Sequence, residues 1–212
     1  MVVGVAMRSL AYGTFLIVGT IAGLCLAYPE PVVVQGPEQW TVDVRFDQPQ
    51  QITLDRQGQG EPKRFWYMLV TLSNKTWQDV DFHPSCELMT DSFQILPAGK
   101  NTPPRVFELI KKRHKSRYPF IESLQQAGTK ILQGQDNAKD IAIIWPDFDR
   151  DAAGINIFIS GLSNETVAID HPIKPQKIYL RKTLELSYSL RGDPAIRSSL
   201  KPEFQTKRWV MR

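Results

Sequence analysis

The sequence predicts a mainly β fold, a β-sandwich with an inserted helical segment and an apolar helix at the N-terminus. Two observations predict the sandwich: about ten short apolar or alternating segments are separated by turn residues roughly every 8–12 positions, and only one internal stretch has a clear helical period. The 212 residues are 42% hydrophobic and 23% charged, enough for a sizeable core. Mean hydropathy of -0.27 excludes a protein that crosses a membrane many times.

The first element is an export signal. The stretch Leu10–Tyr28 contains no charged residue, follows Arg8 and precedes Pro29. These features are typical of a signal peptide cleaved after Ala27, and its length also suits an uncleaved membrane anchor. We interpret residues 1–28 as one or the other, and both place the remaining chain outside the cytoplasm.

Residues 29–39 contain prolines and no helical period, which predicts an extended spacer between the membrane and the fold. The β-sandwich domain is expected over residues 40–212, with the helical insertion at about 103–127. The only cysteine in that domain is Cys86, so it cannot form an internal disulfide and is expected to be buried.

The strands follow from alternation or from continuous apolar runs. Residues 64–73 form an almost unbroken apolar run, which predicts a central strand covered on both faces. The other expected strands cover 40–46, 51–54, 79–83, 86–96, 129–132, 141–145, 155–159, 166–169, 178–180, 184–190 and 208–211.

The helix is expected over Arg105–Arg117. Pro103 and Pro104 precede it, and the spacing of Val106, Ile110 and His114 gives it an apolar face. A second short helix is expected over residues 119–126, ended by a glycine.

Two sets of motifs carry a resemblance. The segment YMLVTLSNKTWQDVDF, residues 67–82, resembles the strand-turn-strand of bacterial extracellular immunoglobulin-like domains. The segments GKNTPPRVFELIKKRHKSRYPF, KILQGQDNAKDIAI and INIFISGLSNETVAIDHP are similar to uncharacterised envelope proteins of planctomycete-type bacteria. The resemblance implies an immunoglobulin-like sandwich in the cell envelope, and it implies no activity.

No catalytic motif accompanies this pattern. The sequence lacks a P-loop, GxGxxG and HExxH, and Gly161-Leu-Ser163 lacks the second glycine of a nucleophile elbow. The sequons at Asn74 and Asn164 are interpreted as turns. We therefore expect no catalytic residues, and the sequence leans away from an enzyme.

One acidic loop leaves an alternative open. Asp147, Asp149 and Asp151 occupy alternate positions, as in a calcium-binding loop, but the glycine and the twelfth-position acid of an EF-hand are displaced or missing. An ordinary acidic turn is the main interpretation. The alternative is a small envelope enzyme or calcium-dependent protein with its site at residues 147–154. No other cofactor is expected.

The charge distribution supplies the main functional hypothesis. The net charge is +4, and the expected helix concentrates basic residues. We expect these residues to contact an envelope protein or an anionic envelope surface: Lys111, Lys112, Arg113, Lys115 and Arg117. The alternative without a binding role is a solvated helix face in which Glu108 forms an ion pair with Lys112. Export argues against nucleic acid, so the predicted function is a non-catalytic envelope binding or assembly module, tethered through residues 10–28 or secreted.

Overall fold

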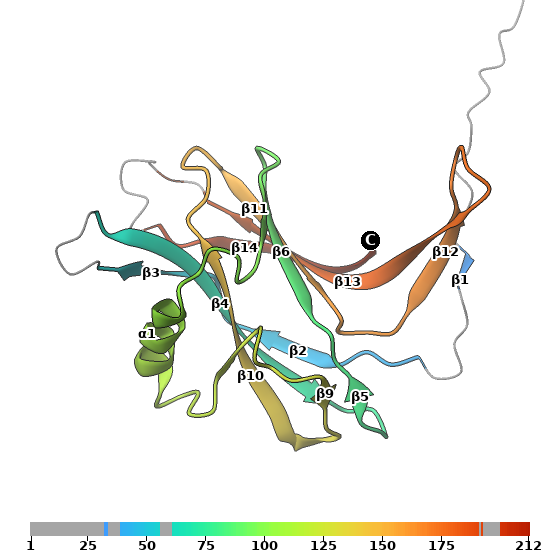
Figure 1. Ribbon diagram of the computed structural model, residues 1–212, viewed down its shortest axis with the longest axis horizontal. Helices are drawn as coiled ribbons and strands as arrows, with labels where there is room; N and C mark the ends of the chain where they lie inside the picture. The colour runs from blue at the N-terminus through green and yellow to red at the C-terminus, as the bar shows by residue number, and fades with distance from the viewer. Residues whose placement is uncertain (1–31, 34–38, 56–60, 191, 193–199) are drawn as a thin grey trace, which may run out of the picture.

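The computed structural model describes residues 32–33, 39–55, 61–190, 192 and 200–212. Strands dominate it, with one helix in the described part, as the sequence predicts (Figure 1). The expected signal or anchor at 1–28 lies outside the described residues.

A seven-stranded sheet forms one layer. Its order is β1-β12-β13-β11-β6-β7, and β14 also pairs with β13. All pairings between these strands are antiparallel. The strands are β1 (Val32–Val33), β6 (Ser85–Thr90), β7 (Ile95–Pro97), β11 (Gly154–Ser160), β12 (Thr166–Asp170), β13 (Lys177–Ser189) and β14 (Glu203–Met211).

A five-stranded sheet packs against it. Its order is β2-β4-β10-β8, with β3 also paired to β4, and a separate two-stranded sheet joins β5 to β9. The strands are β2 (Asp43–Phe46), β3 (Gln50–Leu54), β4 (Lys63–Asn74), β5 (Val80–Asp81), β8 (Glu122–Ser123), β9 (Lys130–Ile131) and β10 (Gly134–Pro146).

Strand β4 is covered on both faces, as its continuous apolar run predicts. Trp66 and Met68 point into the core between the two sheets, where Leu88 and Leu186 of the larger sheet meet them. Tyr67, together with the alternate residues Phe65 and Leu69, points the other way, into a second core beneath the helix. The period of two along a strand thus divides one sequence run between two cores.

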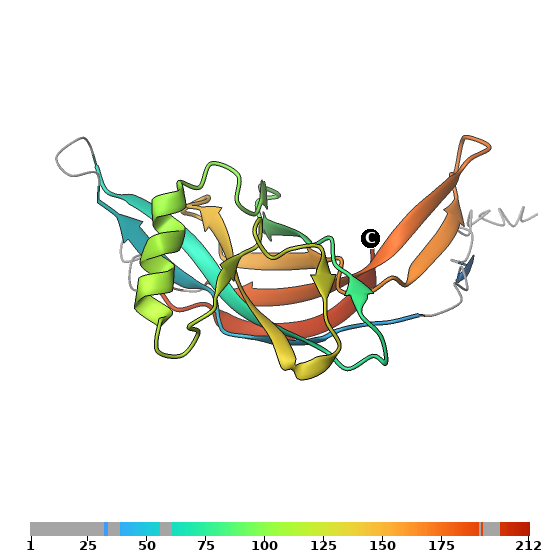
Figure 2. The same ribbon diagram turned by 60° about the horizontal axis from the view of Figure 1, so that its bottom comes forward.

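Helix α1 (Pro104–His114) forms the third layer, across the outer face of the five-stranded sheet (Figure 2). Pro104 occupies the first turn, where a missing N–H costs nothing. Val106 and Ile110 are fully buried against Tyr67 and its neighbours, which confirms the predicted apolar face. The chain leaves the helix in a turn in which the Tyr118 N–H donates to the His114 carbonyl at 2.8 Å.

Four local predictions need correction. The helix expected at 119–126 is absent because the backbone of Glu122–Ser123 pairs with β10 instead and forms the parallel strand β8. The strand expected at 86–96 is a hairpin, β6 and β7, because a turn interrupts it at Phe93, whose φ is 63°. The strands expected at 178–180 and 184–190 are one strand, β13. Within the expected spacer, β1 pairs with β12.

Candidate functional site

The exposed face of α1 presents amines that have no partner in the described structure. Lys111, Lys112 and Lys115 are exposed, and among the described residues none of them takes part in a hydrogen bond or an ion pair. The expected pairing of Glu108 with Lys112 is likewise not formed within the described part of the chain. Because Lys111 and Lys115 are one turn apart, they lie on the same side of the helix.

Arg113 turns toward the sheet. Its Nη1 donates to the backbone carbonyl of Gln51 at 3.1 Å and to the hydroxyl of Tyr67 at 3.2 Å. A guanidinium that joins two groups of the sheet fastens the helix to β3 and β4. Of the predicted contact residues, Arg113 therefore has a structural role.

Arg117 has a partner as well. Its two terminal nitrogens lie 3.3 Å from the two oxygens of Asp47, and the Tyr118 hydroxyl donates to the same carboxylate at 3.1 Å. The guanidinium also lies over the Tyr118 ring, 5.0 Å from its centre. This ion pair closes the turn after α1 onto the end of β2.

The hydroxyl of Tyr67 is the hydrogen-bonding centre of the helix–sheet interface. It donates to Oε1 of Gln50 at 2.9 Å and lies 2.9 Å from Nε2 of His114, which then donates to it. Burial raises the pKa of Tyr67, against the lowering effect of Arg113. Burial also lowers the pKa of His114, and Arg113 adds to this effect. The interface therefore favours a neutral histidine and a protonated tyrosine.

A polar groove begins where the helix cover ends. Along β4 the outward residues change from apolar Leu69 to Thr71, and Thr71 donates to Asp140 of β10 at 2.7 Å. The groove has a volume of about 730 Å³, and its lining includes Thr71, Asp140, Arg45, Asp47 and Tyr118. Burial, and after it Asp47, raises the pKa of Tyr118.

A second cavity, of about 380 Å³, shares Arg45 with this groove. It is lined also by Asp43 and Lys75, which form an ion pair with each other, and by Asp136. Carboxylates and cations thus lie side by side on the part of the sheet face that α1 does not cover. Such a surface is suited to binding charged groups.

The acidic loop at residues 147–154 is fastened to its surroundings. Asp147 accepts a hydrogen bond from Nε1 of Trp66 at 2.9 Å, and its other oxygen lies 3.7 Å from Arg64. Asp149 accepts from the Ser92 hydroxyl at 2.6 Å and from the Asp151 N–H at 3.0 Å. Across the described part of the chain, no three His, Cys, Asp or Glu side chains form a group that could hold a metal ion.

Two smaller predictions can be compared with the structure. Cys86 is buried at 3% exposure, as predicted, and burial raises its pKa. Gly161 has a φ of 83°, and a Cβ there would lie 2.4 Å from the carbonyl oxygen of His83. A tight strand connection accounts for this glycine.

Sequence reasoning missed Asp47, Tyr67 and Asp140. Asp47 lies 70 positions before Arg117, its ion-pair partner, and Tyr67 lies 46 positions before Arg113. Tyr67 sits within an apolar run that gives no sign of its polar partners. Only the tertiary pairing of β4 with β2, β3 and β10 brings these groups to the helix and to the groove beside it.

The chain matches no protein-family model, and no curated protein or solved structure gives a significant match to it. Within the described part of the chain, no helix is both long enough and apolar enough to cross a membrane.

Proposed function

We propose that the protein is a non-catalytic binding or assembly module of the cell envelope, membrane-tethered or secreted, and that α1 contacts an acidic partner. The observation that carries the proposal is the division of roles among the five basic residues at the C-terminal end of α1 and in the turn after it. Lys111, Lys112 and Lys115 are exposed without partners in the described structure, whereas Arg113 and Arg117 hold the helix in place.

A fixed helix favours binding because its lysines are presented with little backbone freedom to lose. The buried residues Val106 and Ile110, the Tyr67 hydroxyl and the ion pair with Asp47 fix α1 along its length. The groove beside its C-terminal end adds charged groups of both signs. These features support recognition of a charged surface.

The proposal also includes a location in the cell envelope and an immunoglobulin-like fold. The uncharged stretch Leu10–Tyr28 supports export, with either cleavage or anchoring. Two sheets that share one core, with antiparallel pairing throughout the larger sheet, support an immunoglobulin-like sandwich in which α1 is the insertion.

Binding of fluorescent poly-L-glutamate to the full chain tests this function. The triple variant Lys111→Glu, Lys112→Glu, Lys115→Glu is expected to bind at least about tenfold more weakly, because attraction becomes repulsion at three positions within about one turn of helix. Raising the salt concentration should also weaken binding by the native chain.

The matched control replaces three lysines outside α1 with glutamate: Lys130, Lys174 and Lys177. They are exposed, and this control makes the same change in net charge. It is expected to alter the affinity by less than about twofold. Equal losses in the two triple variants would show that net charge alone governs binding and would overturn the assignment to α1.

A further inference from the structure

We propose that the tip of the β12–β13 hairpin, the loop 171–176 together with the residue pair Asp170 and Lys177 at its base, lies on the lipid headgroups of the membrane that holds the N-terminal segment. This inference rests on the tethered form of the proposed function. It concerns a different surface from α1, at the other end of the molecule (Figures 1 and 2).

The register of β1 supplies the first argument. Val32 pairs with Ala168 and Val33 with Val167, antiparallel to β12. Strand β12 runs toward the hairpin tip, so β1 runs away from it. The chain therefore enters β1 from the side on which the tip lies.

The length of chain before β1 supplies the second argument. The apolar stretch ends at Tyr28, and the four residue steps from there to Val32 span at most about 14 Å when fully extended. Ala168 lies within a few residues of the tip, and those residues extend along β12 by about 3.3 Å each. The distance along β12 from Ala168 to the tip is therefore no longer than the extended tether, so an anchor that ends at Tyr28 lets the tip reach the headgroups of the bilayer.

The tip is built as a rigid apolar projection. Ile173 is 88% exposed. Nδ1 of His171 accepts hydrogen bonds from the N–H groups of Ile173 and Lys174 at 3.1 and 3.2 Å, and the His171 N–H donates to the Gln176 carbonyl at 2.9 Å. Prolines on both sides of Ile173 and Lys174 restrict the turn further. An isoleucine held in water in this way suits insertion among lipid headgroups.

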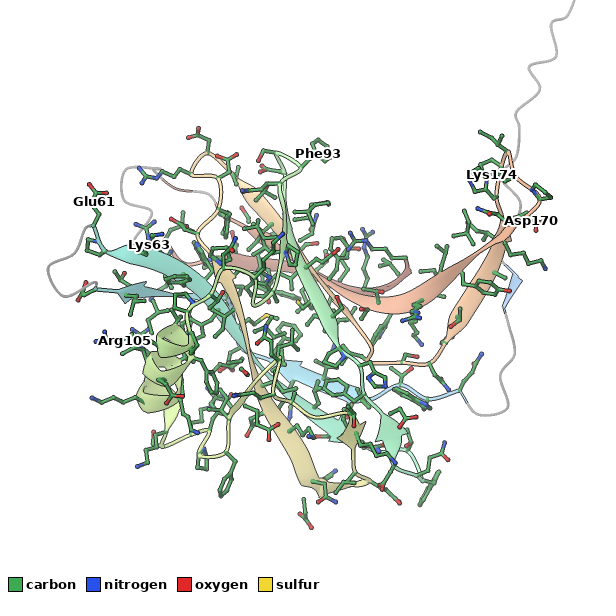
Figure 3. The ribbon with its side chains drawn as sticks, viewed as in Figure 1. Glu61, Lys63, Phe93, Arg105, Asp170 and Lys174 are labelled. Carbon is green, nitrogen blue, oxygen red and sulfur yellow. The ribbon has the colours of Figure 1, made fainter. Side chains whose placement is uncertain are left out.

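The charges of the tip suit an anionic leaflet. Lys174 and Lys177 are exposed, and Asp170, the last residue of β12, lies opposite Lys177 (Figure 3). Each lysine near an anionic membrane surface strengthens attraction by about fivefold. Tyr179, 61% exposed on β13, adds an aromatic ring of the kind found at membrane interfaces.

This orientation also bears on the partner of α1. The helix lies at the end of the long axis opposite the hairpin (Figure 1). A molecule that stands on this tip holds Lys111, Lys112 and Lys115 at the end of its long axis away from that membrane. In that orientation the partner of α1 is an acidic protein rather than the tethering membrane.

The test uses the full chain in vesicles of phosphatidylcholine and phosphatidylglycerol. An environment-sensitive fluorophore is attached at Ile173→Cys or, as the matched control, at Phe120→Cys, which replaces another exposed apolar residue. Cys25 is changed to Ser in both chains, and the buried Cys86 is left in place. Nitroxide-labelled lipids and aqueous iodide serve as quenchers.

The fluorophore at position 173 is expected to be quenched at least about fivefold more by the nitroxide lipid than the one at 120. Lys174→Glu with Lys177→Glu should reduce this difference severalfold, and the triple lysine variant of α1 should leave it unchanged. Equal iodide access at both positions in vesicle-bound chain would overturn the inference about the hairpin alone. A chain that fails to float with vesicles after an alkaline wash would overturn the tether and this inference together.

Discussion

Removing the hydroxyl of Tyr67 tests how α1 is held on the sheet. Tyr67→Phe keeps the fully buried ring and deletes one oxygen that has three partners: Gln50, His114 and Arg113. These partners are half-buried or exposed, so water can replace part of what they lose. With about 0.5–1.5 kcal/mol for each hydrogen bond, we expect the free energy of unfolding to fall by about 2 kcal/mol.

Urea unfolding followed by tryptophan fluorescence measures this change, and thermal unfolding should show a midpoint lowered by roughly 4–8 °C. Tyr179→Phe is the matched control, because within the described structure the Tyr179 hydroxyl has no hydrogen-bond partner and the residue is 61% exposed. The control should change stability by less than about 0.5 kcal/mol. Equal stability of Tyr67→Phe and the native chain would refute a docking role for the hydroxyl.

Two further predictions concern His114, which is half-buried, and Asn74, which is fully buried. Burial lowers the pKa of His114 below its ordinary value of 6.5, so the unfolded chain binds the proton at a higher pH than the folded chain. The contribution of neutral His114 to the free energy of unfolding is therefore fully present above pH 6.5 and is lost as the pH falls through the folded-state pKa. His114→Gln should flatten the dependence of the unfolding free energy on pH between about 7.5 and 5, and an unchanged slope would contradict this account. Asn74 is fully buried, and its amide donates to the carbonyls of Gln78 and Ile131 at 2.8 and 2.9 Å. Asn74→Ala should cost about 2–4 kcal/mol in urea unfolding, against less than about 1 kcal/mol for exposed Asn137→Ala, and similar small losses in both would argue against the buried bonds.

Local patterns in the sequence predicted most of the strands and the helix because these depend on short periods. The run at 64–73 predicted a strand buried on both sides, and the two prolines predicted where α1 begins. The failures occur where tertiary pairing overrides a local pattern. Within residues 119–126, Glu122–Ser123 forms an edge strand because β10 offers free hydrogen-bonding groups there.

The candidate site was predictable only in part. A cluster of basic residues is visible in the sequence, but the sequence does not show which of them find partners. Arg113 and Arg117 acquire theirs from β3, β4 and the end of β2, which are distant along the chain. The polar groove likewise depends on the register that places Thr71 beside Asp140.

The most direct test of the account measures polyglutamate affinity and unfolding free energy together for single alanine variants of the five basic residues at the end of α1 and in the turn after it. Lys111, Lys112 and Lys115 should each lose affinity by about twofold or more at unchanged stability. Arg113 and Arg117 should each lose about 1 kcal/mol of stability and retain most of the affinity. Arginine variants that lose affinity at full stability, with lysine variants that bind normally, would contradict the division of roles on which the proposed function rests.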